Sequence, residues 1–347
     1  RFYQLDRSLG GGDENQYLLD YGDTSLKYIA TTYFFGGHPV FHTLLMRLMI
    51  MGFGDENAIA IRLPAFVSGV ACLWLVYQVA LQLFGSLFIA RLSLLIAALC
   101  PVHVYYSQIA RGYSLLMFLS IAMLYSAIKL LDTPGFKWGA VLALCGALSV
   151  YTVPTNVYFA VSLAVWMIVS LFVPRWAEDH KSPGMPPVKK AVIILVSFLI
   201  MAALTWLAYL PLMSQVMAEA SNYHLAHEQE TSRLAIAGRV PTGTLSLIFP
   251  GALIWFLPLL LAGALFGNTL KKSYRLLPLC IFFLPLLVPL LSGVSGYPRN
   301  YLYNLPLLVI FLAGGIAWAG GFLRRYSPSR FGESALQTAI AAGYVIV

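Results

Sequence analysis

Long apolar segments recur along the chain and are separated by short polar links. Most of these segments hold about twenty residues, the length of helix that crosses roughly 30 Å of hydrocarbon. A spanning segment must close its backbone hydrogen bonds internally, and no run of alternating ten-residue strands is present, so the pattern predicts helices rather than a barrel. We therefore predict an all-α polytopic membrane protein whose ten spans lie near residues 58–84, 86–105, 112–131, 136–153, 155–174, 189–212, 247–268, 275–293, 301–322 and 334–347.

The segment before the first predicted span has a different pattern. Residues 38–52 are apolar, but they are too few to cross a membrane and they include Arg47, which suits a helix lying in the membrane interface. We therefore divide the chain into an extracytoplasmic loop with this interfacial helix, residues 1–57, and a transmembrane helical bundle, residues 58–347.

Two further features of the pattern concern the longest link and the ends. Residues 213–246 form the longest polar stretch, and we expect a loop there that contains one short helix at most. The chain starts at Arg1 without a methionine and ends at Val347 inside an apolar run. We therefore expect another span before Arg1 and more chain after Val347.

Composition and charge exclude a soluble protein and set the expected orientation. Hydrophobic residues make up 59% of the chain and charged residues 10%. The net charge of +8 predicts cytoplasmic loops rather than nucleic-acid binding, because Lys and Arg collect in the cytoplasmic links of membrane proteins. Alternate links hold thirteen basic residues and four acids, and we assign them to the cytoplasm. The first loop is then extracytoplasmic.

Arginines are the first candidates for chemistry, because three of them lie where outer links meet predicted spans. These are Arg62, Arg111 and Arg299. A guanidinium group matches the oxygens of a phosphate, so the three side chains could converge on a phosphate group. Arginines at such positions also reach lipid headgroups without any further role, and this alternative stays open.

Carboxylates and histidines occupy the same predicted side of the membrane. Asp13 and Glu14 form an acidic pair in the first loop, where a carboxylate near arginines could accept a proton from a hydroxyl group or bind a metal. His38 and His42 share one helix face, but the glutamate of a zinc-hydrolase motif is missing. A histidine pair at positions 224 and 227 is interpreted as ordinary loop residues.

Five stretches, taken in order, resemble one family of membrane glycosyltransferases with the GT-C fold. This family comprises the protein O-mannosyltransferase-like and aminoarabinose-transferase-like enzymes, glycosyltransferase family 39 and its bacterial relatives. The stretches are "LGGGDENQY", "GHPVFHTLL", "IRLPAFVSGV", "YYSQIARGYSLLMF" and "YPRNYLYNLPLL". The resemblance is strongest over residues 1–130 and returns near residues 297–310.

The resemblance implies transfer of a sugar from a polyprenyl-phosphate donor to an acceptor hydroxyl, usually with inversion. Asp13 would be the general base, and Glu14 would support it or hold a divalent metal together with His38. Arg62, Arg111 and Arg299 would hold the donor phosphate. His38, Tyr113 and Tyr301 would position the acceptor or the loop.

The same resemblance implies where the protein works and what it contacts. We expect an integral protein of a bacterial cytoplasmic membrane, with membrane lipids around it and its active site on the extracytoplasmic side. Its acceptor could be a lipid, a glycan or a protein, and no cofactor is certain, a divalent metal staying open. Two alternatives remain: a catalytically silent subunit that scaffolds a membrane complex, and a transporter of a lipid-linked substrate.

Overall fold

Helices make up all the regular secondary structure in the described part of the chain. The computed structural model describes residues 5–8, 12–33, 38–55, 57–173, 185–227, 233–248, 251–267, 270, 272–292 and 297–326. The all-α class predicted from the apolar segments is confirmed.

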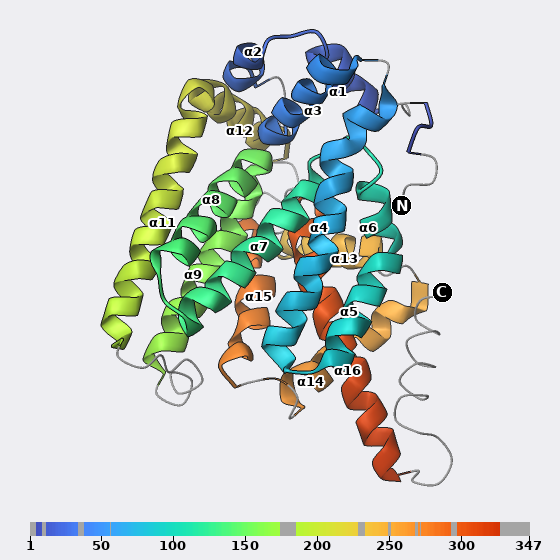
Figure 1. Cartoon of the computed structure of the whole chain (residues 1–347), viewed down its shortest axis with the longest axis vertical. Coiled ribbons are helices and arrows are strands. Elements are labelled where there is room, and N and C mark those ends of the chain that lie inside the picture. Colours follow the sequence, from blue (N-terminus) through green and yellow to red (C-terminus); the bar gives the residue numbers. More distant parts are fainter. Residues whose placement is uncertain are drawn as a thin grey trace.

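The long helices lie alongside one another in a bundle (Figure 1). In chain order they are α4 (Ala58–Phe84), α5 (Leu87–Leu99), α7 (Tyr113–Asp132), α8 (Phe136–Thr152), α9 (Val157–Phe172), α11 (Pro187–Tyr209), α14 (Leu257–Phe266), α15 (Leu276–Ser292) and α16 (Leu305–Tyr326). Helix α7 packs against both α4 and α8, and its side chains are buried along nearly its whole length. An apolar helix without a polar face belongs at the centre of a bundle, and α7 takes that place.

Local sequence signals fix the ends of these helices. The side chains of Asn57 and Ser86 accept hydrogen bonds from backbone N–H groups three residues later, at Ala60 and Ile89, and so begin α4 and α5. Gly85 follows the last residue of α4 with a φ of 63°, a left-handed conformation that costs glycine little. These caps leave only two residues between α4 and α5, so the two helices pack side by side.

Short helices form a second layer over one end of the bundle (Figure 1). They are α1 (Asp13–Tyr21), α2 (Leu26–Thr31), α3 (Val40–Phe53) and α12 (Met213–His227). Apolar side chains of these helices, of α11 and of neighbouring segments form a second cluster, distinct from the main core. Its buried members include Tyr17, Tyr21, Ile29, Tyr33, Val40, Met46, Tyr209 and Leu212. We call these four helices the outer layer.

One side chain of α12 ties this layer together. The amide oxygen of Gln215 accepts a hydrogen bond from the N–H of Tyr33 at 2.7 Å, and its amide nitrogen donates to the carbonyl of Thr31 at 2.8 Å. The end of α2 is therefore attached to a helix almost two hundred residues later in the chain.

The remaining elements lie between the outer layer and the bundle or link its helices. They are α6 (Pro101–Tyr106), α13 (Arg233–Ile248) and the short 3₁₀ helices η1 (Pro154–Asn156), η3 (Leu210–Leu212), η4 (Gly251–Phe256), η5 (Lys272–Tyr274) and η6 (Pro298–Asn304). Helix α13 packs against α15 and η6, and it lies across the direction of the long helices (Figure 1).

The predicted spans correspond to helices, although the number of membrane crossings stays a prediction. Five helical segments of the described chain are long and apolar enough to cross a membrane: Ala58–Phe84, Tyr113–Asp132, Pro154–Phe172, Pro187–Glu219 and Pro298–Leu323. Other predicted spans are shorter helices, and the one expected at 86–105 is divided because Pro101 starts a new helix. The span expected at 334–347 lies outside the described residues.

The prediction of a loop at residues 213–246 is wrong. Two helices, α12 and α13, occupy most of this stretch. The stretch is polar but rich in Ala, Glu and Leu, which favour helix, and its polarity alone misled the prediction. The division at residue 57 coincides with the start of α4, while the assignment of two domains stays a prediction.

A glycine pair in α16 provides a test of the bundle. A Cβ atom on Gly315 would lie 2.2 Å from the carbonyl oxygen of Leu260 on α14, so the two backbones touch there. We expect Gly315→Ala to lower the free energy of unfolding by about 1–3 kcal/mol, because backbone cannot move aside as a side chain can. Thermal unfolding in detergent would measure this.

The matched control for this test is Gly52→Ala in α3, where a Cβ atom meets nothing within 4 Å. This control should leave the melting temperature unchanged or raise it slightly, since alanine favours helix. Equal melting temperatures for both variants would contradict the close packing of α14 and α16.

Candidate functional site

A buried ion pair joins the acidic pair of α1 to the first turns of α4. Arg62 is fully buried, and Glu14 is 7% exposed. The Nε and Nη2 atoms of Arg62 donate to the two carboxylate oxygens of Glu14 at 2.9 and 2.8 Å. This two-point contact is the strongest geometry that an arginine and a carboxylate can form.

The remaining donors of Arg62 hold the segment before α1. Its Nη1 donates to the carbonyls of Leu5 at 2.8 Å and Arg7 at 2.7 Å, and its Nη2 donates to that of Ser8 at 3.3 Å. A guanidinium group has five N–H donors, and all five are used here. No donor of Arg62 remains for a phosphate, so the geometry supports a positioning role instead.

Glu14 also connects α1 to the segment that carries Arg111. Its Oε1 accepts a second hydrogen bond, from the backbone N–H of Ala110 at 2.8 Å. Both oxygens of Glu14 are therefore engaged inside the protein. A single ion pair fixes α1, α4 and the turn before α7 relative to one another.

Arg111 lies next to this ion pair and inside a group of aromatic rings. Its guanidinium carbon is 4.8 Å from the centre of the Tyr17 ring and 5.6 Å from that of Tyr113. Only 6% of Arg111 is exposed. The structure thus places Arg111, predicted to hold the donor phosphate, against Tyr113, predicted to position the acceptor or the loop.

Gly112, the residue after Arg111, lies in close contact with Pro39 and Thr152. A Cβ atom on Gly112 would lie 2.7 Å from the Cβ of Pro39 and 2.9 Å from the Cγ2 of Thr152. The residue after Arg111 must therefore be very small.

His38 is fully buried between the rings of the outer layer. Its ring stacks on Tyr21 with centroids 4.5 Å apart, and it lies 5.8 Å from Tyr17. One nitrogen, Nδ1, is 3.2 Å from the Tyr21 hydroxyl, and the other, Nε2, is 3.1 Å from the hydroxyl of Thr43. These contacts support the prediction that His38 orients the loop.

Both histidines of this region are held in the neutral form. The pKa values of His38 and His42 fall from 6.5 to about 3, first because burial disfavours the charged ring and then because of the positive charge of Arg111. The charge of Glu14 raises the pKa of His42 but does not outweigh these effects. Neutral imidazoles leave Arg111 as the main positive charge of this region.

Arg299 reaches the site from the C-terminal half of the chain. It is the second residue of η6, and its guanidinium lies 4.9 Å from the centre of the Tyr297 ring. Tyr301 in the same element is buried and packs near Tyr303, with ring centroids 5.9 Å apart. Tyr301 thus supports η6 from within the core.

Tyr106, which was not among the predicted site residues, connects the two halves. Burial and then the neighbouring Tyr113 raise the pKa of Tyr106 to about 12, while Arg299 and Arg111 both act to lower it. Its ring centroid is 4.9 Å from that of Tyr113. Both guanidinium groups therefore lie within electrostatic range of one tyrosine hydroxyl. The only sequence signal was its place in the tyrosine-rich stretch before Arg111.

Other predicted residues cannot be placed in the same detail. Asp13 is the first residue of α1, next to Glu14, but its side chain lies outside the described part of the chain, as do the side chains of His224 and His227. Among the described residues, no three His, Cys, Asp or Glu side chains come together to hold a metal.

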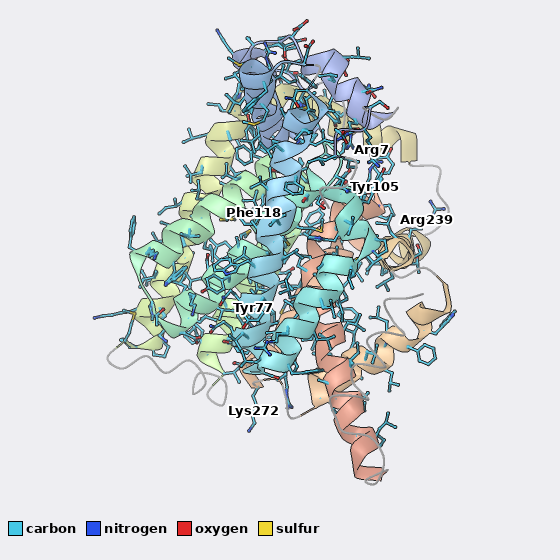
Figure 2. All side chains as sticks on the ribbon, turned by 45° about the vertical axis from the view of Figure 1, so that its right-hand side comes forward. Arg7, Tyr77, Tyr105, Phe118, Arg239 and Lys272 are labelled. Atoms are coloured by element: carbon cyan, nitrogen blue, oxygen red, sulfur yellow. The ribbon has the colours of Figure 1, made fainter. Side chains whose placement is uncertain are left out.

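The site lies at one end of the molecule. Figure 2 places Arg7 and Tyr105 near the outer layer and Lys272 at the opposite end of the bundle. Arg62, which donates to the carbonyl of Arg7, and Tyr106, next to Tyr105 in α6, belong to the first of these ends.

Comparison with known proteins identifies the fold. Residues 37–206 match the model of the dolichyl-phosphate-mannose-protein mannosyltransferase family. The structure of ArnT from Cupriavidus metallidurans bound to undecaprenyl phosphate is similar with a TM-score of 0.59 and 16% sequence identity, covering 99% of this chain and 66% of that one. The chain has the GT-C fold. The resemblance inferred from the five sequence stretches is confirmed.

Two further structures share the GT-C fold. Apo ArnT from the same organism gives a TM-score of 0.55 at 14% identity, covering 97% of this chain and 64% of that one. The archaeal oligosaccharyltransferase AglB from Archaeoglobus fulgidus, in complex with an inhibitory peptide and a dolichol-phosphate, gives 0.51 at 14% identity, covering 96% and 50%. This GT-C chain thus spans about two thirds of ArnT and half of AglB. No curated protein matches it.

Breaking the Glu14–Arg62 ion pair should unfold the outer layer. We expect Glu14→Ala to lower the free energy of unfolding by about 3–5 kcal/mol, because Arg62 would be left as a buried charge without its carboxylate. The measurement is thermal unfolding together with size-exclusion chromatography in detergent. The control is Asp20→Ala, which changes a partly exposed acid of the same helix. If Glu14→Ala and Asp20→Ala have the same melting temperature, the ion pair does not stabilise the fold.

The buried histidines predict a dependence of stability on pH. Below pH 6.5 the unfolded chain binds more protons than the folded protein, whose two histidines stay neutral down to about pH 3. Stability therefore falls as the pH decreases through this range, by about 2 kcal/mol for each histidine at pH 5. Melting temperatures at pH 7.5 and pH 5 measure the effect.

The variant His42→Leu isolates one of these histidines. Leucine fills a similar volume and does not titrate, so the loss of stability between pH 7.5 and pH 5 should shrink by about half. An unchanged pH dependence in this variant would show that His42 is protonated equally in the folded and unfolded states.

Proposed function

We propose that this GT-C chain transfers a sugar from a polyprenyl-phosphate donor to an acceptor hydroxyl. The observation that carries the proposal is the packing around the start of α7: Arg111 lies over the rings of Tyr113 in α7 and Tyr17 in α1, and η6, which carries Arg299, packs against α7. Two guanidinium groups from opposite halves of the chain can hold one phosphate group between them. The family matched by residues 37–206 and the similar structures support the same class of reaction.

In the proposed reaction the acceptor oxygen attacks the anomeric carbon of the donor sugar. The bond between that carbon and the phosphate oxygen breaks, and the electron pair leaves with the polyprenyl phosphate. Asp13 takes the proton of the acceptor hydroxyl, and Arg111 and Arg299 stabilise the negative charge of the leaving phosphate. Attack opposite the leaving group inverts the configuration.

The other predicted residues have supporting roles in this proposal. Arg62 and Glu14 position α1, and so set where Asp13 lies relative to Arg111. His38 connects the start of α3 to α1, through Thr43 and the Tyr21 ring. The basic links fall at the end of the bundle that holds Lys272, so we place the reaction on the extracytoplasmic side.

The reaction is tested by two variants that fail in different ways. Asp13→Asn should lower the rate of sugar transfer from polyprenyl-phosphate donors in proteoliposomes by about 100-fold or more, since it removes the base. It should bind undecaprenyl phosphate as tightly as wild type. Arg299→Gln should weaken both transfer and undecaprenyl phosphate binding, because it removes a phosphate ligand.

The control is Asp20→Asn, which makes the same change of charge in the same helix but at the other end of α1. It should transfer sugar at the wild-type rate. If Asp13→Asn is as active as this control, Asp13 is not the base. If wild type and Arg299→Gln bind undecaprenyl phosphate equally, Arg299 is not a phosphate ligand.

A further inference from the structure

Three aromatic rings form a row across α4, α7 and α8, away from the candidate site. The ring centroids of Trp74 and Tyr125 are 6.3 Å apart, and those of Tyr125 and Trp138 are 5.7 Å apart. Trp74 is 58% exposed, and the other two rings are partly exposed. Tyr77, one turn after Trp74 on α4, lies in the lower half of the bundle in Figure 2, toward Lys272.

Two lysines place their ammonium groups on this row. Lys129 lies over the Tyr125 ring with its nitrogen 5.4 Å from the centroid, and Lys137 lies over the Trp138 ring at 5.1 Å. Because Tyr125 and Trp138 are in contact, the two positive charges flank one aromatic pair. Ring faces attract cations, so the rings keep both ammonium groups at the surface of these helices.

The acid nearest to Lys129 and Lys137 in sequence, Asp132, interacts with a different lysine. Asp132 ends α7 and interacts electrostatically with Lys190 on α11, whose ammonium group also donates to the carbonyl of Leu131 at 2.9 Å. Lys129 and Lys137 form no ion pair within the described part of the chain. Their two charges therefore remain available to an anion from outside.

The groups of the row are ordered by depth. Trp74 lies about 15 Å before the end of α4 and Tyr125 about 10 Å before the end of α7, from the rise of 1.5 Å for each helical residue. Lys129 is about 5 Å from the end of α7, and Lys137 is in the first turn of α8. Apolar rings are thus deeper in the bundle and the charges are nearer its end. A phospholipid presents its acyl chain, glycerol and phosphate in the same order.

We propose that Trp74, Tyr125, Trp138, Lys129 and Lys137 form a binding site for one anionic phospholipid. The phosphodiester group lies between the two ammonium groups, and an acyl chain lies along the ring of Trp74. A lipid fits better than a protein partner, because α4 and α7 are long and apolar enough to span the membrane and the Trp74 ring of α4 is exposed. Anionic headgroups attract lysines at this depth.

The test measures how tightly lipids bind to the purified protein. Native mass spectrometry in detergent measures the dissociation constants of phosphatidylglycerol and phosphatidylcholine for wild type, for Lys129→Gln/Lys137→Gln and for Arg91→Gln/Lys272→Gln. Arg91→Gln/Lys272→Gln removes two exposed charges, one in α5 and one in η5, without changing the aromatic row, so its net charge equals that of Lys129→Gln/Lys137→Gln. The phosphatidylglycerol affinity should fall about tenfold or more in Lys129→Gln/Lys137→Gln and less than about twofold in the control, Arg91→Gln/Lys272→Gln.

Two outcomes would overturn the proposal. Equal losses in both double variants would mean that phosphatidylglycerol responds to overall charge rather than to this site. Equal retention of phosphatidylglycerol and phosphatidylcholine by wild type would mean that the row is an ordinary part of the membrane interface. The second comparison needs no variant, so it decides the matter even if a substitution disturbs folding.

Discussion

The ion pair between Glu14 and Arg62 is the interaction on which the rest of the outer layer depends. A buried charge is costly unless every donor and acceptor around it is used, and Arg62 uses all five of its N–H groups within the protein. The cost is offset because the same contacts fix three separate segments: the chain before α1, the start of α4 and the turn before Arg111. The fold can therefore keep a short polar helix in one orientation above an apolar bundle.

The candidate site needs this rigidity because its residues come from distant parts of the chain. Arg111 follows α6, and Arg299 opens η6 almost two hundred residues later. Tyr106 lies within electrostatic range of both, and η6 packs against α7 and α13. Gln215 adds a second long-range connection, from α12 to the end of α2. A displacement of either half would change the distance between the two guanidinium groups, on which the proposed phosphate binding would depend.

The sequence predicted the helices well and the contacts poorly. Apolar segments of spanning length, with caps such as Asn57 and Ser86, are local properties, and the helices follow them. The stretch 213–246 failed because polarity was taken as a sign of a loop, although its residues favour helix. Sequence position placed Glu14, Arg62 and Arg111 on one side of the membrane. The sequence could not show that Glu14 forms an ion pair with Arg62, because that pairing is set by tertiary packing.

Charges at the two ends of the molecule are used in opposite ways, and this difference follows from burial. At the outer end Arg62 and Arg111 are shielded by a carboxylate and by tyrosine rings, and the neighbouring histidines are neutral. A low-polarity site strengthens the attraction of the remaining positive charge for a phosphate. At the other end Lys129 and Lys137 lie over the partly exposed rings of Tyr125 and Trp138. The same pairing of cation and aromatic ring therefore fixes a buried charge at one end of the protein and a partly exposed charge at the other.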